Sequence, residues 1–452
     1  MSQDNRARLK QWLASGEARL QPLTFPQREL WEASPVPAAD ASNNICAIIK
    51  MRGPLTQQIC EAAVQKVVDR QEVLRLSFLP GKDGPVQLIR KAAKSVMCFR
   101  ELAPSEQHPA AIEGLVQGVF SEPFDLVRGP LYRMEVFRRA PDDHVLVFAI
   151  HHAIADGWTL GVFVQDLFTA YMESAKGVQT ALPPVPLSYA DWGVSERAFW
   201  QPAELARRAT YWKSHLAGTR RLWSPPAGPT LATGKRERWA MNVTAELGCA
   251  VRERARRDGA TLFSTLLTAF QITLSKWTGA DDILVGTPVA NRNKQAVRET
   301  MGYCSGIVPL RGQVDRARSF SDSLRAVHEA TMESFANAMP FAELVKALGE
   351  PVVPGRNPIF EVRFALQNHP VPDVALPGLS LKLRMRSTGT ARFDLGCEIN
   401  EEGDGLEVAW LFRLDMFSLE EIQELGRMYA AVLKGVCQSP EILTSALMSN
   451  LR

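Results

Sequence analysis

The sequence predicts an α/β protein of two lobes, and three observations lead to this prediction. The chain has 452 residues, whereas a single hydrophobic core rarely grows beyond about 250–300 residues. A helix followed by a strand is predicted in each half, at 55–78 and at 260–289. Between them, residues 176–192 contain three prolines and no clear periodicity, which is typical of a linker. The resulting divisions are a first lobe at 1–177, a linker at 178–195 and a second lobe at 196–452.

The first half shows a regular succession of patterns. Residues 144–150 form an almost continuous apolar run, which predicts a strand covered on both faces. The other predicted elements are a helix at 55–69, a strand at 73–78, a hairpin at 79–89, a strand at 131–138 and a helix at 158–175.

The second half repeats the same kinds of element. Residues 260–279 form a strongly apolar helix, and 281–289 follow as a buried strand. Near the end of the chain, a strand at 406–414 precedes an amphipathic helix at 419–436. The repetition favours a shared architecture for the two halves, although any α/β chain would show such units.

The composition excludes several classes of protein. Hydrophobic residues make up 46% and the net charge is only +3, which is too small to indicate nucleic-acid binding. No apolar run approaches the ~20 residues of a membrane helix, and the polar N-terminus lacks a signal peptide's apolar centre. The seven cysteines include no C-x-x-C pair, so neither a zinc site nor a disulfide framework is expected. We expect a cytoplasmic monomer with no nucleic-acid or membrane partner.

One stretch, "VFAIHHAIADGWTLGVF" (147–163), carries the chemistry. His151 and His152 end the predicted strand, and Asp156 and Gly157 follow at once. A strand end is a rigid mount for a side chain, and glycine lets the backbone approach a ligand closely. Histidine accepts a proton readily near neutral pH. Asp156 could orient the ring directly, or could fix the loop through an arginine.

Other kinds of site lack their usual residues. A metal site would need a third ligand, and neither H-E-x-x-H nor a cysteine cluster is present. A serine nucleophile lacks its G-x-S-x-G turn, since "GYCSG" (302–306) does not match. Nucleotide binding has no support, because no glycine-rich phosphate motif occurs. A purely structural histidine pair is the simplest alternative and stays open at this point.

The motifs then point to a family. "HHAIADG" (151–157) resembles the HHxxxDG signature of condensation domains of nonribosomal peptide synthetases. Further segments resemble other motifs of that family, in its order and along nearly the whole chain, with Gln71 where histidine is usual. They are "LTFPQRELWEAS" (23–34), "RQEVLRLSF" (70–78), "PFDLVRGPLYR" (123–133), "YADW" (189–192), "VGTPVANRN" (285–293), "MGYCSGIVPLR" (301–311) and "GRNPIFEVRFALQN" (355–368).

The resemblance implies two chloramphenicol-acetyltransferase-like lobes that form a V-shaped pseudo-dimer with a central channel. In such proteins a carrier protein delivers an acyl thioester on its phosphopantetheine arm, and no cofactor is bound permanently. The sequence has no adenylation signature and no carrier attachment motif. We therefore expect the acyl- or peptidyl-carrier protein to act in trans, with a small alcohol or amine as acceptor.

The resemblance also implies roles for single residues. His152 faces the reaction, and the backbone N–H of Gly157 lies near the thioester oxygen. Asp156 is structural and paired with an arginine, which matches Arg292 here. His151 is expected to turn into the protein and fix the loop. Three further residues are expected to line the substrate channel: Trp158, Tyr303 and Ser305.

The function implied is transfer of a polyketide or peptidyl chain, with release of an ester or amide. The segment "EARLQPLTFPQRELWEASPVP" (17–37) resembles ester-forming, chain-releasing members. Two alternatives stay open. One is a non-catalytic scaffold that recruits assembly-line partners. The other is an epimerisation-type relative, which keeps HHxxxDG but needs a second acid/base group that the sequence does not identify.

Two arginine-rich segments, "GTRRLW" (218–223) and "GKRERW" (234–239), are candidate contacts for an acidic carrier protein. The competing interpretation is that they are ordinary solvated charges.

Overall fold

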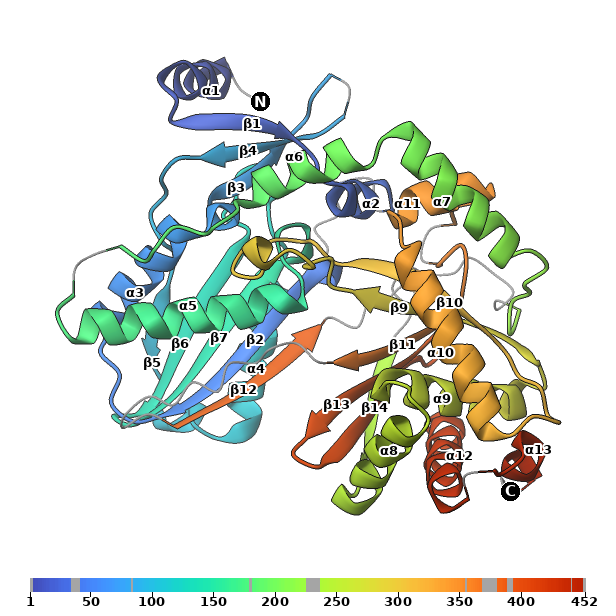
Figure 1. The fold of residues 1–452 in the computed structure, drawn as a ribbon. Coiled ribbons are helices and arrows are strands. Elements are labelled where there is room, and N and C mark those ends of the chain that lie inside the picture. Colours follow the sequence, from blue (N-terminus) through green and yellow to red (C-terminus); the bar gives the residue numbers. More distant parts are fainter. Residues whose placement is uncertain are drawn as a thin grey trace. The chain divides into compact units, whose positions relative to one another are not determined.

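Two mixed sheets, each with its own helices, organise the chain in this computed structural model (Figure 1). Unit 1 contains the chain up to Trp200, the segment 290–305 and strand β12 (Ser380–Ser387). Unit 2 contains the rest. The structure describes residues 3–33, 41–82, 84–178, 181–224, 236–353, 356–367, 380–387, 393–439 and 441–449.

The division along the chain differs from the sequence-based one. The prediction assigned all of 196–452 to the second lobe, but the segment 290–305 and β12 belong to unit 1. The predicted linker contains a helix, α6 (Tyr189–Phe199), which buries Tyr189 and Trp192 in unit 1. The prolines before α6 do mark an irregular stretch, but the aromatic residues after them bring the chain back into the core.

Unit 1 is built on a five-stranded sheet of order β12-β2-β7-β6-β5 and a small sheet of order β1-β4-β3. Its other elements are α1 (Gln3–Ser15), β1 (Ala18–Pro22), α2 (Phe25–Ala33), β2 (Asn44–Arg52), α3 (Gln57–Arg70), β3 (Leu76–Leu79), β4 (Val86–Arg90), β5 (Cys98–Glu101), α4 (Pro109–Ser121), β6 (Tyr132–Ala140), β7 (Asp143–His151) and α5 (Gly157–Ala175).

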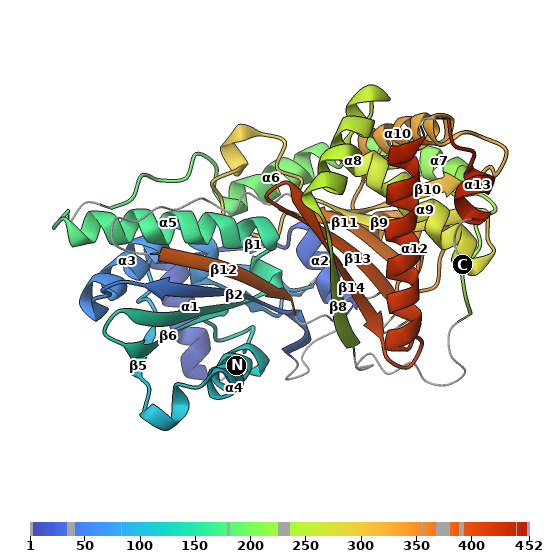
Figure 2. The ribbon, with the colours of Figure 1, turned by 90° about the horizontal axis from the view of Figure 1, so that it is seen from below.

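Strand β7 is buried on both faces, as its sequence predicts. Leu146, Phe148 and Ile150 join the core beneath α3 and α5. The residues between them join a second core beneath α4. Figure 2 shows this sheet between α5 and α4. A continuous apolar run results because side chains alternate between two covered faces.

The predicted hairpin at 79–89 forms between β3 and β4, which pair antiparallel. The strand predicted at 73–78 is only partly correct. Residues Glu72–Arg75 form a 3-10 turn, and the strand begins at Leu76. Val73 and Leu74 are nonetheless buried, so their apolar side chains serve the core from a turn.

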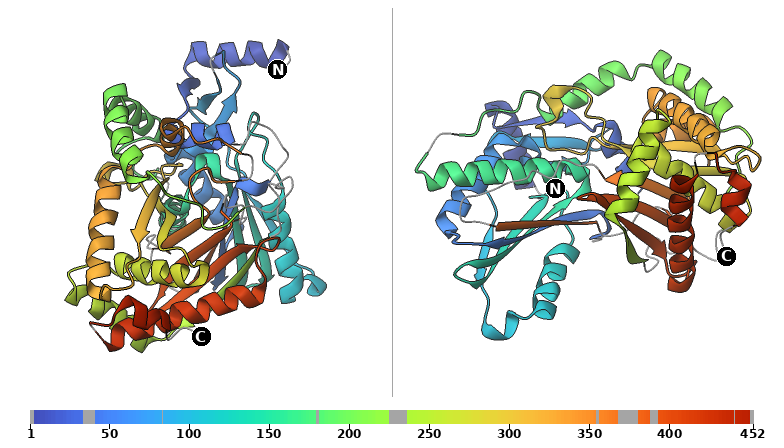
Figure 3. Two further views of the ribbon diagram at one scale, coloured as in Figure 1. Left: turned by 90° about the vertical axis from the view of Figure 1, so that its right-hand side faces the viewer. Right: turned by 60° about the horizontal axis from the view of Figure 1, so that its bottom comes forward.

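Unit 2 is built on a six-stranded sheet of order β10-β9-β11-β13-β14-β8. Figure 3 shows α8, α9 and α12 packed along this sheet. Its elements are α7 (Pro202–His215), β8 (Arg236–Val243), α8 (Ala245–Arg257), α9 (Leu262–Thr278), β9 (Asp282–Val289), β10 (Gly306–Gln313), α10 (Phe320–Ala336), α11 (Phe341–Leu348), β11 (Val362–Gln367), β13 (Leu395–Glu402), β14 (Gly405–Arg413), α12 (Leu419–Gln438) and α13 (Thr444–Ser449). The helices predicted at 260–279 and 419–436 and the strands predicted at 281–289 and 406–414 are all present.

None of the helices in the described ranges combines the length and apolarity that crossing a membrane requires.

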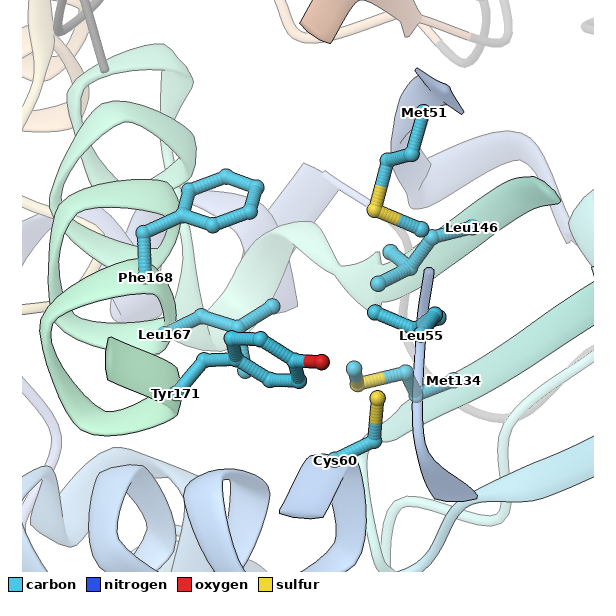
Figure 4. A pocket seen from close by; sticks show the side chains of 8 residues that line it. All are labelled: Met51, Leu55, Cys60, Met134, Leu146, Leu167, Phe168 and Tyr171. Carbon is cyan, nitrogen blue, oxygen red and sulfur yellow. The ribbon is translucent and has the colours of Figure 1, made fainter. Parts of the chain in front are cut away.

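A small apolar cavity of about 20 Å³ lies in unit 1, between α5 and the sheet (Figure 4). The thiol of Cys60 lines it, and burial raises the pKa of this thiol to about 12. The other lining residues are Met51, Leu55, Met134, Leu146, Leu167, Phe168 and Tyr171. Cys60 therefore behaves as a small hydrophobic residue and not as a reactive thiol.

We predict a sharp difference in thiol reactivity across the folded protein. Cys98 and Cys249 are exposed and should react within minutes with a maleimide near pH 8, where a free thiol of pKa ~8.5 is partly ionised. Cys60 should stay unmodified. Peptide mapping by mass spectrometry measures each site, and labelling in denaturant provides the reference. Labelling of Cys60 at the rate of Cys98 would contradict its assigned burial.

Candidate functional site

The signature stretch lies where β7 ends and α5 begins. The last residue of β7, His151, pairs with Asn44 in β2, and its N–H donates to the carbonyl of Leu131 at 2.9 Å. One 3-10 turn, His152–Ile154, follows. Asp156 then caps α5 by accepting from the N–H of Thr159 at 2.9 Å. An aspartate followed by glycine at a helix start is thus a local capping arrangement.

His151 turns into the protein. Its side chain is buried, and its Nδ1 accepts from the N–H of Ala153 at 3.1 Å. The ring of Phe124 contacts it edge-on, at 6.3 Å between centroids. Because Nδ1 accepts, the neutral ring carries its proton on Nε2. His151 therefore fixes the peptide group that follows His152.

His152 is half-buried, and its ring meets the ring of Tyr303 at a centroid distance of 4.4 Å and an angle of 62°. Its backbone carbonyl accepts from the N–H of Ala155 at 3.2 Å. The peptide group between His152 and Ala153 is thus held on both its oxygen and its N–H. This turn gives the imidazole a rigid base.

Asp156 and Arg292 form a buried ion pair, as their motif positions suggest. Their side chains are 3% and 1% exposed, and Arg292 Nη2 lies 3.1 and 3.2 Å from the two carboxylate oxygens. Asp156 also accepts from the hydroxyl of Thr159 at 2.9 Å and from the N–H groups of Cys304 and Ser305, each at 3.1 Å. None of its hydrogen bonds within the described chain goes to His152.

The charges of this pair stabilise each other. Burial by itself would raise the pKa of Asp156, but Arg292 and the hydrogen bonds hold that pKa below its usual value. Burial would likewise lower the pKa of Arg292, and the Asp156 carboxylate raises it. Both groups therefore stay charged at neutral pH.

Arg292 also folds the segment 290–305. Its Nη1 donates to the carbonyls of Val297 at 3.0 Å and Thr300 at 2.6 Å, and its Nη2 donates to that of Gly302 at 2.9 Å. Planar guanidinium groups suit such convergent acceptors. The arginine thus organises the segment that places Tyr303 beside His152.

The remaining candidates contribute in different ways. The indole of Trp158 donates to the carbonyl of Arg298 at 2.8 Å, so it binds the segment 290–305 to α5. Ser305 is half-buried and contributes its backbone N–H to Asp156. Gly157 is the first residue of α5, where N–H groups lack intrahelical acceptors and the helix dipole favours negative charge. The described residues contain no cluster of three or more His, Cys, Asp or Glu side chains suited to a metal ion.

Several residues at the site were not identified from the sequence. Thr159 contacts Asp156 through both its hydroxyl and its N–H. Gln71 binds the N–H of Met301 at 3.0 Å. Gln27 and Tyr189 approach the site from two other motif segments. Membership of those motifs was the available signal, but it gave no indication of their partners.

We predict that Asp156→Asn lowers the free energy of unfolding by about 3–5 kcal/mol at neutral pH, because it leaves Arg292 buried without a counter-charge. The depressed pKa of Asp156 gives stability that is present above its unfolded pKa of ~3.9 and lost as the pH falls through the folded value. Urea unfolding across this range should show the wild-type advantage shrinking with acidity. A pH-independent difference would contradict the ionic assignment.

Comparison with known proteins agrees with this site. A stretch of the linear gramicidin synthase of Brevibacillus parabrevis is 32% identical over 432 residues, which cover 93% of this chain. The phosphinothricin tripeptide synthetase PhsB of Streptomyces viridochromogenes is 30% identical over 435 residues, which cover 94%. The chain spans only 8% and 36% of the lengths of these two relatives.

Solved structures show the same fold. The condensation domain from the Monacolin K polyketide synthase MokA matches with a TM-score of 0.83 at 18% identity, covering 94% of this chain and 99% of that one. The X-domain from teicoplanin biosynthesis matches with a TM-score of 0.82 at 23% identity, covering 95% and 97%. The predicted α/β, chloramphenicol-acetyltransferase-like fold class is thereby confirmed.

A sequence model of the condensation domain matches residues 17–449, which is nearly the whole chain. Condensation domains are acyltransferases that work with substrates bound to carrier proteins. On this match and on the relatives above, the chain belongs to the condensation-domain family.

Proposed function

We propose that this protein transfers a polyketide or peptidyl chain from the phosphopantetheine thioester of a carrier protein, acting in trans, to a soluble alcohol or amine. The product would be an ester or an amide, released from the carrier. The observation that carries the proposal is the half-buried imidazole of His152, mounted on a turn whose peptide groups are held from both sides. A base for acyl transfer needs such an accessible, fixed position.

The reaction follows from the groups present. His152 takes the proton of the acceptor's O–H or N–H as its oxygen or nitrogen attacks the thioester carbon. The first N–H groups of α5, at Gly157, stabilise the developing oxyanion. Collapse of the tetrahedral intermediate breaks the C–S bond and expels the phosphopantetheine thiolate. The imidazolium returns its proton to that sulfur, so no external reactant is consumed.

Asp156 supports this chemistry without touching the reactants. Both of its oxygens bind Arg292 and several other donors, so the carboxylate is engaged in shaping the loop. In this proposal Trp158, Tyr303 and Ser305 border the channel through which the substrates meet. The V-shaped arrangement of the lobes and the channel remain predictions.

The arginine-rich segments now give little support to carrier binding. Arg221 pairs with Glu361, and Arg238 pairs with Glu407. Arg236 donates to the carbonyl of Phe393 at 2.5 Å, while residues 234 and 235 lie outside the described residues. Most of these guanidinium groups therefore serve unit 2 itself, which leaves Arg220 as the remaining candidate contact.

We predict that His152→Ala reduces transfer to an alcohol by about 10²–10⁴-fold, the usual range for general-base catalysis. Transfer to a matched amine should fall less, because a deprotonated amine is the stronger nucleophile. Single-turnover rates with one acyl-loaded carrier, measured below saturation for each acceptor, test this. His108→Ala, which removes an exposed histidine at the start of α4, is the matched control.

The outcomes are distinct. Equal fractional losses for both acceptors would mean that His152 positions the substrates and does not act as a base. Wild-type rates with both would remove His152 from the mechanism.

A second candidate has one observation in its favour. A similar solved structure, with a TM-score of 0.81 and 23% identity, is a complex of the X-domain and OxyB from teicoplanin biosynthesis. A scaffold of this kind would recruit another protein. The wild-type chain would then give no transfer to either acceptor in the same assay. Inversion of a carrier-bound peptidyl residue, without transfer, would instead indicate an epimerisation-type activity.

A further inference from the structure

We propose that a buried polar network of Thr24, Gln27, Gln87 and Tyr189 positions His152 against Tyr303. The network reaches a backbone carbonyl next to each ring of that pair. The inference rests on the proposed function, because it assigns positioning residues to the same base. Nothing in the motif resemblance gives these four side chains a role.

The first branch holds the turn that carries His152. Gln27 Nε2 donates to the carbonyl of Ala153 at 3.0 Å. The same nitrogen donates to Gln87 Oε1 at 3.2 Å, and Gln87 Nε2 donates to the carbonyl of Pro22 at 2.8 Å. Since His151 already holds the N–H of Ala153, both polar groups of the residue after His152 are fixed.

The second branch holds Tyr303. The hydroxyl of Tyr189 donates to the carbonyl of Tyr303 at 2.9 Å and lies 2.9 Å from Thr24 Oγ1. Its single proton is engaged with Tyr303, so the Thr24 hydroxyl donates to Tyr189. Burial raises the pKa of Tyr189 well above its usual value, which keeps this proton in place.

The two branches join at the start of α2. Gln27 Oε1 accepts from the N–H of Thr24 at 3.0 Å, and the N–H of Gln27 donates to Thr24 Oγ1 at 3.4 Å. A single turn of chain therefore connects the carbonyl beside His152 with the carbonyl of Tyr303. A shift of this turn would move both rings of the pair.

The network is tightly packed. A Cβ added at Gly193 would lie 2.9 Å from Thr24 Cγ2, and one added at Gly302 would lie 2.2 Å from the Tyr189 ring. Both glycines thus allow close approach. Tight packing limits the alternative positions of each hydrogen-bonding group.

Packing alone does not require polar side chains here. All four are at most 2% exposed, and burying a polar group is unfavourable unless its hydrogen bonds are satisfied. Apolar residues of the same shape, such as valine for Thr24 and phenylalanine for Tyr189, can be equally stable. What such residues lack is the directional hold on two carbonyls beside the reacting pair.

The test begins with two nearly isosteric variants. Thr24→Val and Tyr189→Phe should each lower kcat by about tenfold, because a misplacement of about 1 Å can cost about 10²-fold. The KM for the acceptor should change little. Thr24→Ser keeps the hydroxyl and should retain the wild-type rate. Tyr171→Phe removes a tyrosine hydroxyl bonded elsewhere, to the N–H of Thr56, and is the matched control.

The decisive measurement repeats Tyr189→Phe in a His152→Ala background. If the network acts through His152, Tyr189→Phe should not lower the residual rate further. The same tenfold loss in both backgrounds would overturn the proposal, as would wild-type kcat for both network variants. A wild-type rate for His152→Ala alone would instead overturn the proposed function, so the two failures are distinguishable.

Thermal unfolding and carrier binding are measured for every variant. If Tyr189→Phe does not fold, Gln27→Met tests the other branch, since it keeps the side-chain length but removes the bond to Ala153. It should lower kcat and leave carrier binding intact. Full activity in a folded Gln27→Met protein would overturn the proposal.

Discussion

The buried ion pair between Asp156 and Arg292 is the interaction on which the rest of the site depends. A charge removed from water is tolerated only when a counter-charge and hydrogen bonds satisfy it. Asp156 meets this condition with donors from α5 and from the segment 290–305, and Arg292 meets it with three carbonyls of that segment. The need to satisfy both groups therefore joins the start of α5 to chain that lies more than a hundred residues later in the sequence.

This arrangement explains why the signature contains two histidines and an aspartate without forming a hydrogen-bonded triad. The carboxylate is fully used by the loop, and His151 is used by the backbone of Ala153. Of the three side chains, His152 is the one that presents its ring at a half-buried position. Orientation of that ring comes from backbone hydrogen bonds and from contact with Tyr303, and not from Asp156. Such a base is held by rigidity, which suits a site that must admit two large substrates.

The same unit gathers its supporting residues from separated stretches of the chain. The start of α2, the start of α6 and the segment 290–305 all converge on the turn after β7. Each brings side chains or backbone groups that are buried and hydrogen-bonded. Motifs that look independent along the sequence are therefore parts of one hydrogen-bonded assembly in unit 1. Strand β12 joins the same unit by pairing with β2 over its full length.

The sequence by itself determined the features that depend on local pattern. The apolar run at 144–150 specified a strand buried on both faces, because side chains alternate and both faces are covered. The motifs identified the family, and through it the pairing of Asp156 with Arg292. Only the tertiary structure decided that the segment 290–305 and β12 belong to unit 1, that Glu72–Arg75 form a turn, and that Gln27 and Tyr189 hold carbonyls beside His152 and Tyr303. Periodicity and capping are encoded by neighbours along the chain, whereas the partner of a buried amide or hydroxyl is set by which distant segments the fold brings within about 3 Å.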